Sequence, residues 1–279
     1  MNWPKISIIT PSYNQDKFLR QTLESVLSQN YPNLQYIVID GGSKDKSVEI
    51  IRDYADRLDY WVSESDEGQS DAINKGLSHA DGEIVTWINS DDLLMPGSLH
   101  AVGQVWRRDP HLDLLSAACI RIGPDNEFFY WHCVPRQTMY FASHGVIYID
   151  QPGTFWRRRF FECQQVLDTG CHTVMDHDLW YRIALGAGRN RRLRRCTGAI
   201  RIHESTKSST IPEVFCREVA DLRKRYCNGL EQVSGATTLA YRAWKCFTGD
   251  YLIKALYSLK PPRNVVRFLR EIQTTSNEK

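Results

Sequence analysis

The chain lacks a long apolar run, a strong net charge and a metal-binding cysteine spacing. No hydrophobic stretch is long enough to cross a bilayer, and 35 Lys and Arg against 33 Asp and Glu leave a net charge of only +2. The eight cysteines show no C-x-x-C pair and no paired histidine pattern of a zinc site, so we expect reduced thiols. The amino terminus has no secretory pattern, so we expect a cytoplasmic protein.

The composition is that of an ordinary globular protein, but its charge is polarised along the chain. With 279 residues and 42% hydrophobic side chains, the chain can form one large domain or a domain with an appendage. Residues 1–140 hold 12 basic and 20 acidic side chains, whereas residues 141–279 hold 23 and 13. An acidic half can hold a metal ion, and a basic half can meet phosphates or an anionic membrane surface.

Short apolar strands alternate with amphipathic helical patterns over the first part of the chain. The predicted strands are residues 6–9, 34–39, 60–62 and 83–88. Between them, apolar residues recur at helical spacing. This alternation predicts an α/β fold with a mostly parallel, doubly wound sheet flanked by helices.

Polar clusters follow three of these strands, at residues 10–14, 40–43 and 90–92. Right-handed crossovers would bring the three clusters to one edge of the sheet, where open α/β sheets bind ligands. In the last cluster, Asp91 and Asp92 supply paired hard oxygens, which suit magnesium or manganese. The alternative is that one of them caps the helix that starts near Pro96.

Beyond residue 97 the alternation loosens. Strand-like runs occupy 113–122, 127–133 and 145–149, and a helix opens near Asp176. From Pro212 the pattern is helical, with breaks at Gly229, 234–235 and 261–262. We therefore expect a catalytic domain over 1–210, with a ligand-binding half at 1–97 and a second half at 98–210, followed by a helical tail at 211–279.

Several motifs, in order, are similar to those of glycosyltransferase family 2, the inverting nucleotide-sugar transferases with a GT-A fold. They are TPSYNQ at 10–15, DGGSKDKS at 40–47, DEGQSDAINKGL at 66–77, GEIVTWINSDD at 82–92, QPGTFWRR at 151–158, MDHDLWYR at 175–182 and RIHESTKS at 201–208. The resemblance covers roughly residues 4 to 210, and it implies a GT-A-like, Rossmann-like catalytic domain with a C-terminal helical extension.

The resemblance implies a nucleotide-sugar site in the first half. The implied contact residues are Thr10, Pro11, Ser12, Asn14, Asp40, Ser43, Asp71, Lys75 and Asp91. Asp40 would accept from the base, although Asp40 and Ser43 can also simply cap the next helix. Asp71 is equally well explained by the dipole of its own helix. Asp92 would coordinate the metal through the diphosphate.

The family's catalytic pair, Glu-Asp, is replaced here by Met175-Asp176, with a further acid at Asp178. Helical positions two apart point about 200° away from each other, so only one of the two acids can face the cleft. Asp178 lies four residues before Arg182, which is the spacing of a helix ion pair. We therefore assign Asp178 to structure and Asp176 to the role of general base.

The resemblance also implies roles for four residues of the second half. Trp156 and Arg157, or its neighbour Arg158, would lie on the acceptor side, although a lone aromatic is more often part of the core. His203 would complete the metal shell, and Lys207 would hold the diphosphate, with a solvated loop as the alternative.

The basic runs at 157–159 and 189–195 accompany no nucleic-acid-binding signature, so we expect no nucleic-acid partner. The tail mixes aromatic and cationic residues in helices, as helices that lie on membranes do. Packing of the tail against the catalytic domain explains the same pattern. Peripheral contact with the inner membrane face would suit a lipid-linked acceptor.

Together these features predict a metal-dependent transferase. It would move a sugar from a UDP- or GDP-linked donor to a hydroxyl of a glycan or lipid-linked glycan, with inversion, in cell-surface polysaccharide or glycolipid synthesis. One alternative is a nucleotidyltransferase, but TPSYNQ stands where that class has a basic, Gly-rich phosphate loop. The other is a silent nucleotide-sugar-binding protein, if Met175 marks a lost base.

Overall fold

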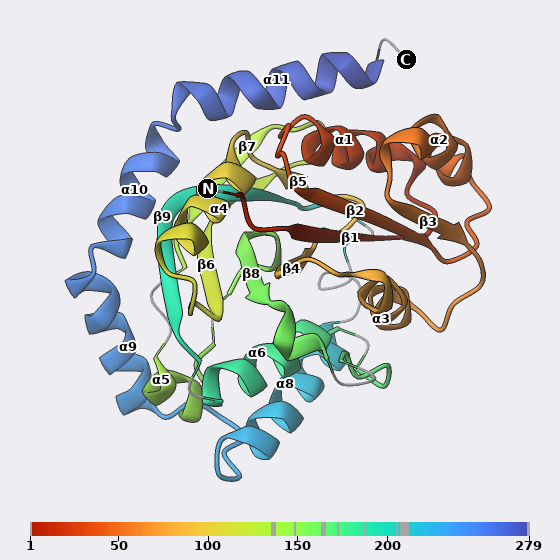
Figure 1. Cartoon of the computed structure of the whole chain (residues 1–279). Coiled ribbons are helices and arrows are strands. Elements are labelled where there is room, and N and C mark those ends of the chain that lie inside the picture. The colour runs from red at the N-terminus through yellow and green to blue at the C-terminus, as the bar shows by residue number, and fades with distance from the viewer. Residues whose placement is uncertain are drawn as a thin grey trace.

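A computed structural model describes residues 2–134, 138–147, 149–162, 166–171, 173–186, 188–204, 206 and 212–277. Within these residues, nine strands form one sheet with helices packed on both of its faces (Figure 1). Eight strands follow the order β3-β2-β1-β4-β8-β6-β9-β5, and β7 pairs with β6. The predicted α/β class is confirmed.

The first half of the sheet is parallel. Its elements are β1 Ile6–Ser12, α1 Asp16–Leu27, β2 Leu34–Asp40, α2 Ser47–Asp53, η1 Ala55–Arg57, β3 Tyr60–Ser63, α3 Gln69–His79 and β4 Ile84–Trp87. β1 pairs in parallel with both β2 and β4, and β2 pairs in parallel with β3. The carboxyl ends of β1, β2 and β4 therefore lie along one edge, as the polar clusters predicted.

The second half of the sheet is mixed. Its elements are β5 Leu93–Leu94, α4 Ser98–Arg108, β6 Leu114–Ile122, β7 Phe128–His132, α5 Met139–Ser143, η2 Gln151–Gly153, β8 Thr154–Arg157, η3 Arg158–Phe161, α6 Met175–Leu185 and β9 Asn190–Arg201. β8 is antiparallel to β4 and β6, whereas β6 and β9 are parallel. The strand predicted at 145–149 is wrong for residues 145–147, which form no strand.

Two apolar cores lie on opposite faces of the sheet. Because side chains alternate along a strand, β1 sends Ile9 to one core and Ile6 and Ile8 to the other. The first core includes apolar side chains of α3 and α6, and the second includes those of α1 and α4. Both cores hold the parallel strands in place, so the loops at their carboxyl ends have a rigid base.

The C-terminal helices are built into the molecule. They are α8 Pro212–Tyr226, α9 Gly235–Phe247, α10 Asp250–Leu259 and α11 Arg263–Asn277. The predicted breaks separate α8 from α9 and α10 from α11, whereas the break at 248–249 between α9 and α10 was not predicted. They run around the side of the sheet, and α11 lies alongside α1 (Figure 1). Val265, Leu269 and Ile272 of α11 close a third core over β5, β6 and β9. The helices of the predicted tail therefore pack against the sheet and its flanking helices.

The helices and cysteines of the described residues bear on two expectations from the composition, the lack of a membrane-crossing segment and the reduced thiols. None of the helices in the described part of the chain combines the length and apolarity that a membrane crossing requires. The seven cysteines among the described residues are free thiols.

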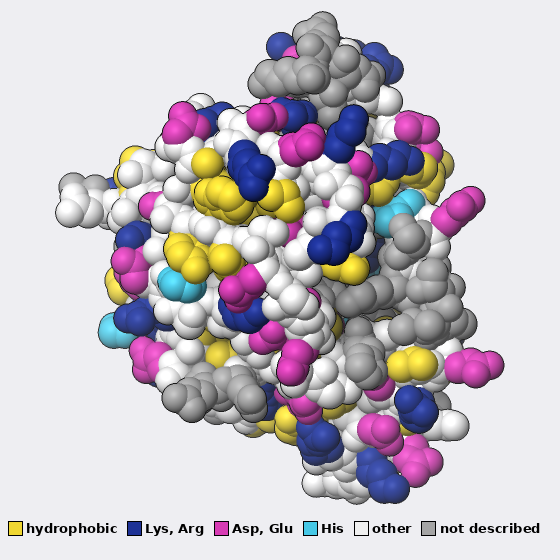
Figure 2. Space-filling model, turned by 90° about the vertical axis from the view of Figure 1, so that its right-hand side faces the viewer, with side chains coloured by type: hydrophobic (Ala, Val, Ile, Leu, Met, Phe, Trp, Pro, Cys, Tyr) yellow, Lys and Arg dark blue, Asp and Glu magenta, His cyan; other side chains and the backbone are white. Residues whose placement is uncertain are grey.

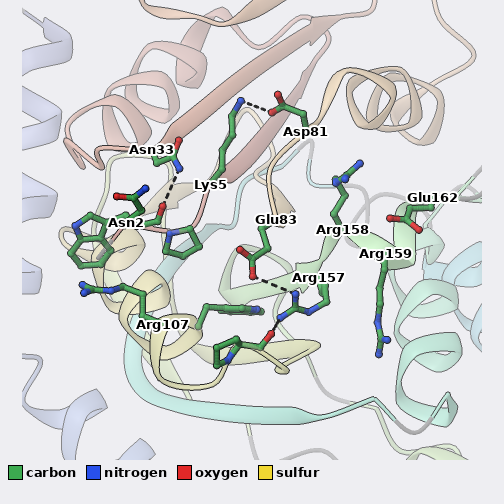
Figure 3. Close-up of a pocket in the computed structure, with 14 residues that line it drawn as sticks. Asn2, Lys5, Asn33, Asp81, Glu83, Arg107, Arg157, Arg158, Arg159 and Glu162 are labelled. Carbon is green, nitrogen blue, oxygen red and sulfur yellow. Dashed lines mark hydrogen bonds and ion pairs between the residues drawn. The ribbon is translucent and has the colours of Figure 1, made fainter.

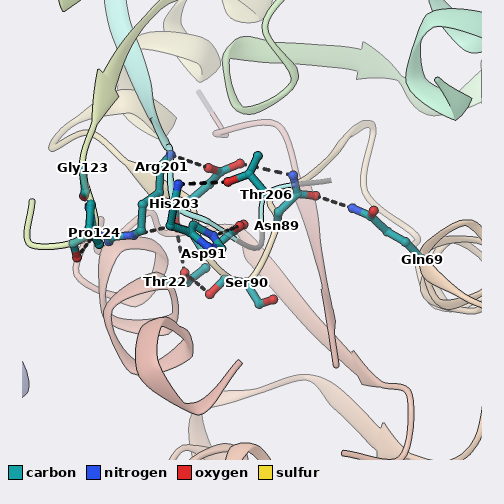
Figure 4. A network of polar contacts seen from close by, with 11 residues as sticks. Thr22, Gln69, Asn89, Ser90, Asp91, Gly123, Pro124, Arg201, His203 and Thr206 are labelled. Carbon is teal, nitrogen blue, oxygen red and sulfur yellow. Dashed lines mark hydrogen bonds and ion pairs between the residues drawn. The ribbon is translucent and has the colours of Figure 1, made fainter. Parts of the chain in front are cut away.

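Arg201, the last residue of β9, ties the two halves of the sheet together (Figure 4). Its side chain is only 1% exposed. Its backbone N–H donates to Asp92 Oδ1 at 3.0 Å. Its guanidinium donates to the carbonyl oxygens of Asp91, Gly123 and Pro124 and to the side-chain oxygens of Asn126 and Gln21. One buried cation therefore joins three other segments of the chain, which contain Gln21, Asp91 and residues 123–126.

Replacing Arg201 by methionine should destabilise the whole protein, because five buried acceptors would lose their donor. We expect a loss of about 3–5 kcal/mol and a fall in melting temperature of roughly 10 °C, measured by circular dichroism. Arg194→Met is the matched control, since Arg194 is an exposed arginine of the same strand. Equal melting temperatures for the two variants would show that the network contributes little.

Candidate functional site

Two cavities lie at opposite edges of the parallel strands. The carboxyl-edge pocket, of about 440 Å³, is lined by the loop after β1, by residues 89–92 after β4 and by α6. The amino-edge cavity, of about 710 Å³, is larger, but many of its charges pair within its wall (Figure 3). Lys5 meets Asp81 at 2.6 Å, and Arg157 meets Glu83 at 3.3 Å. Since α/β sheets bind ligands at carboxyl ends, the carboxyl-edge pocket is the candidate site.

Surface charge does not mark a competing site on the face that Figure 2 shows. Basic and acidic side chains are intermixed there, rather than gathered into a field of one sign (Figure 2). This distribution is unlike the continuous basic surface that a nucleic acid requires.

The turn that carries Asp91 and Asp92 is held from behind by α1. Thr22 Oγ1 lies 2.8 Å from the carbonyl oxygens of both Ser90 and Asp92. The carboxylate of Asp92 accepts from the Arg201 backbone and from Asn89, and the residue is 2% exposed. Burial, assisted by the charge of Asp91, raises the pKa of Asp92 well above its usual value. Neither acid caps α4, whose N-cap is Gly97 with no side-chain bond.

His203 pairs with Asp91 rather than with Asp92. Its Nε2 lies 2.9 Å from Asp91 Oδ2, and the two side chains are 8% and 19% exposed (Figure 4). The backbone N–H of His203 donates to Thr206 Oγ1, which fixes the loop after β9. The pair joins a residue of the first half to one of the second, two positions beyond Arg201.

Asp91 and His203 can act as neighbouring ligands of a divalent ion. Among the described residues, no group of three His, Cys, Asp or Glu side chains gathers as a complete metal site. Magnesium-type ions commonly use one or two protein ligands and take the rest of their shell from phosphate oxygens and water. The Asp91–His203 pair fits an ion held in this shared way.

Asp176 lies in the first turn of α6 and lines the same pocket. It is half-buried, and the backbone N–H of His177 donates to it at 2.8 Å. Burial raises the pKa of Asp176, although His177 opposes the shift. A carboxylate in this setting can accept a proton more readily than an exposed one.

Asp178 is committed to structure, as its spacing predicted. Its carboxylate accepts from Arg182 Nε at 2.9 Å and from the Tyr226 hydroxyl at 2.8 Å. The predicted ion pair with Arg182 is confirmed. Asp178 does not line the carboxyl-edge pocket, so Asp176 is the acid of α6 that is available there.

The end of β1 contributes Pro11, Ser12 and Tyr13 to the wall. Ser12 Oγ and Gln151 Oε1 are buried and have no hydrogen-bond partner among the described residues. Buried polar atoms usually have partners, so these two wall atoms suit a polar ligand. Tyr13, which is 58% exposed, was missed from the sequence, although it lies inside TPSYNQ between predicted wall residues.

Asp40 does not line the pocket, which corrects its predicted contact with the base. It is fully buried, and it accepts from the backbone N–H groups of Gly42 and Ser43 and from the hydroxyls of Ser43 and Ser63. These bonds hold the loop after β2. They do not cap α2, whose N-cap is Lys46 with no side-chain bond, so the capping alternative is also wrong. Asp40 pairs in register with Ser12, so it shapes the loop behind the wall.

Two further residues that were predicted to line the pocket instead support the loops next to it. Thr10 is buried, and its hydroxyl lies 2.9 Å from that of Tyr36. Asn14 joins two loops, because its backbone N–H donates to Ser43 Oγ and its side chain accepts from the Lys44 backbone. Neither lines the pocket.

Asp71 and Lys75, which were predicted to contact the nucleotide sugar, lie outside the pocket wall, whereas two neighbouring residues of the same motif line it. Lys75 pairs with Glu64 at 3.0 Å and with Asp71 at 3.3 Å, and neither Asp71 nor Lys75 lines the pocket. Asp66 and Gln69, from the same motif, do line it. Burial raises the pKa of Asp66.

The acceptor-side assignments of Trp156 and Arg157 are wrong. Trp156 is fully buried and stacks on Trp87 at 4.8 Å between ring centroids, so no sugar can reach its face. Arg157 and Arg158 line the amino-edge cavity. Lys207 lies outside the described residues.

The second half supplies wall residues that the sequence did not single out. They are Arg121, Asp150, Gln151, Thr173, His177, Trp180, Thr206 and Phe215. They come from several separate elements, so no local pattern groups them. Gln151, His177, Trp180 and Thr206 stand inside the recognised motifs, which is the one signal that could have found them.

Known proteins share this architecture. The chain is 42% identical over 97 residues to an uncharacterized glycosyltransferase of Haemophilus influenzae, a match that covers 34% of this chain and 39% of that relative, so the chain spans about two fifths of its length. S. aureus TarS 1-349, solved in complex with UDP, superimposes with a TM-score of 0.60 at 18% identity, covering 93% of this chain and 76% of TarS.

A third similar protein is the mannosyltransferase PcManGT of Pyrobaculum calidifontis, solved with GDP-Man and Mn2+. It has a TM-score of 0.60 at 18% identity, and the likeness covers 100% of this chain and 87% of that one. At such identities the two structures establish the fold. The model of the family described as Glycosyl transferase family 2 matches residues 7–186, well over half of the sequence. The chain therefore belongs to glycosyl transferase family 2.

Proposed function

We propose that this protein transfers a sugar from a UDP- or GDP-linked donor to an acceptor hydroxyl, with inversion. The observation that carries the proposal is that Asp91, joined to His203, and Asp176 line or border one pocket at the carboxyl edge of the sheet. The bound UDP of TarS and the bound GDP-Man and Mn2+ of PcManGT support a nucleotide-sugar donor.

The donor would lie across the ends of β1 and β4. Tyr13 and Ser12 would meet the nucleoside, and the diphosphate would approach Asp91 and His203. Asp91 and His203 would hold a divalent ion, which when bound would supply neutralisation of the charge on the leaving group. The sequence predicted Asp92 as the metal ligand, and Asp92 lines the same pocket. Because its carboxylate already accepts from Arg201 and Asn89, we propose Asp91 as the ligand and Asp92 as the residue that holds the turn.

Asp176 would remove the proton of the acceptor hydroxyl. Its raised pKa brings it closer to the range in which a carboxylate works well as a base. The acceptor oxygen would then attack the anomeric carbon as the bond to the diphosphate breaks. A single displacement of this kind inverts the configuration at that carbon.

His203→Ala should weaken nucleotide binding by about tenfold, and mainly when metal is present, because one of two protein ligands is lost. Binding of UDP, GDP and their sugar conjugates would be measured by calorimetry with Mn²⁺ and with EDTA. His111→Ala replaces an exposed histidine and serves as the control. Unchanged affinity of His203→Ala in Mn²⁺ would remove His203 from the site.

Asp176→Asn should lower kcat by about 10²–10⁴ while leaving nucleotide affinity near the wild-type value. Release of nucleoside diphosphate from the bound donor would report turnover. Asp178→Asn should instead lower thermal stability.

In the wild type, kcat should fall as the pH falls through the raised pKa of Asp176, because the protonated acid cannot accept a proton.

A reversed result for the two variants would move the base to Asp178. Nucleotide binding by a wild type that shows no turnover with any acceptor would favour a silent binding protein.

A glycan or lipid-linked glycan is the acceptor class we propose, within cell-surface polysaccharide or glycolipid synthesis. Support comes from α10, whose inner face packs on β7 while its outer face remains exposed. Leu252, Leu256 and Leu259 are 64%, 57% and 87% exposed, and Phe247 nearby is 85% exposed. An apolar face of this kind on a short helix suits the interface of a bilayer.

The charges around this face favour an anionic membrane. Exposed basic side chains of 235–263 are Arg242, Lys254, Lys260 and Arg263. The one carboxylate in that range, Asp250, is buried and pairs with Arg192. The outer surface of α9 and α10 therefore combines apolar and cationic groups without a competing acid.

The wild type should float with vesicles that contain anionic lipid at low salt, and much less with neutral vesicles. Leu252→Ser combined with Leu256→Ser should reduce the bound fraction at least severalfold. Leu230→Ser, which changes a 39% exposed leucine between α8 and α9, is the control. Equal flotation with both vesicle types, or none at low salt, would contradict the membrane contact.

A further inference from the structure

A further cavity adjoins the carboxyl-edge pocket on the side of the tail. This tail-side cavity has a volume of about 470 Å³, within the range of small-molecule sites. Six residues line both spaces: Arg121, Ile149, Asp150, His177, Trp180 and Phe215. Beyond them, α8 and α9 supply much of the wall, including Val219, Arg223 and Tyr241. The carboxyl-edge pocket, proposed above as the donor site, therefore shares part of its wall with a cavity whose remaining wall comes largely from α8 and α9.

A buried charge cluster stands at the junction. Asp150 is 5% exposed and lies 2.7 Å from both Arg121 Nη2 and His132 Nδ1. Burial by itself would raise the pKa of Asp150, but His132 and Arg121 hold the pKa below its usual value. Asp150 thus remains ionised and forms an ion pair with Arg121. The guanidinium of Arg121 is therefore already neutralised and is not the group we expect to bind an anionic ligand.

Arg223 lines this cavity, and no carboxylate of the described residues forms an ion pair with it. Its Nε donates to the carbonyl oxygen of Gly145 at 3.2 Å, and its side chain is half-buried. By contrast, Arg225 and Lys224 of the same helix are both paired. A partly desolvated guanidinium beside apolar walls is stabilised by an anion.

Aromatic side chains form much of the remaining wall. Trp180 is 2% exposed, and His177 stacks on it at 5.0 Å. The indole Nε1–H of Trp180 is buried and has no acceptor among the described residues, although buried indoles usually have one. A buried indole donor without an acceptor, on the wall of this cavity, suits a hydroxyl group of a sugar.

We propose that the tail-side cavity is the acceptor subsite, and that it takes a carbohydrate bearing a phosphate or carboxylate group, held by Arg223. The inference rests on the proposed transferase function. Asp176 lines the carboxyl-edge pocket, which shares six wall residues with this cavity, so the reacting hydroxyl of the acceptor would enter that pocket from the junction. There its proton passes to Asp176, its oxygen bonds to the anomeric carbon, and the nucleoside diphosphate leaves.

The test measures binding of glucose, glucose 6-phosphate and glucuronate by saturation-transfer NMR and calorimetry. Mn²⁺ and saturating UDP or GDP, whichever binds, keep the donor pocket filled. The two anionic sugars should bind the wild type more tightly than glucose does. Arg223→Met should weaken their binding about tenfold, as expected for a lost charged hydrogen bond.

Lys224→Met is the matched control, since it removes the neighbouring charge from an exposed position on the same helix. It should leave binding unchanged, and Arg223→Lys should restore part of the affinity. Binding of one anionic sugar alone would support the subsite and identify the group as phosphate or carboxylate.

Three results would overturn the subsite: equal affinity for glucose and both anionic sugars, equal losses in Arg223→Met and Lys224→Met, or no binding of any sugar by a protein that binds nucleotide. Failure to bind UDP and GDP would contradict the proposed function itself. The two failures are therefore distinguishable.

Discussion

The site depends on burying one guanidinium, that of Arg201, where segments from both halves of the chain meet. A guanidinium presents its N–H groups in a fixed planar fork, so its acceptors have little freedom in their placement. Gln21, Asn126 and the carbonyl oxygen of Asp91 therefore take defined positions around it. The strand that follows Asp92, β5, pairs with β9, and His203 lies two residues beyond Arg201, so its imidazole reaches Asp91 from the neighbouring strand.

The same constraint gives two adjacent acids different properties. Asp92 receives the Arg201 backbone and is sealed from solvent, so burial and the charge of Asp91 both disfavour its ionised form. Asp91 keeps partial exposure and an imidazole partner. Turn geometry, rather than residue type, thus separates a buried, hydrogen-bonded carboxyl group from a partly exposed one in the wall of the same pocket. A cation at Asp91 would also relieve the repulsion on Asp92.

The sequence was sufficient where a local rule decides the outcome. Parallel strands deliver their carboxyl ends to one edge, and the spacing of Asp178 and Arg182 fixed their pairing. It was insufficient where strand direction decides. β8 runs antiparallel to β4, so Arg157 emerges at the amino edge and Trp156 points into the core. Nothing within QPGTFWRR reveals that direction, and the bonds that occupy Asp40 were equally invisible.

The tail shows how one segment can serve two surfaces. Its inner side chains, such as Phe215 and Tyr241, complete the wall of the tail-side cavity, while Leu252 and Leu256 remain outside. Asp250 pairs with Arg192 and is buried, so its carboxylate does not reach the exposed surface of α9 and α10. An acceptor attached to a membrane would then approach from the side where the tail closes the pocket. The same helices would hold the enzyme at its substrate and shape the cavity that receives it.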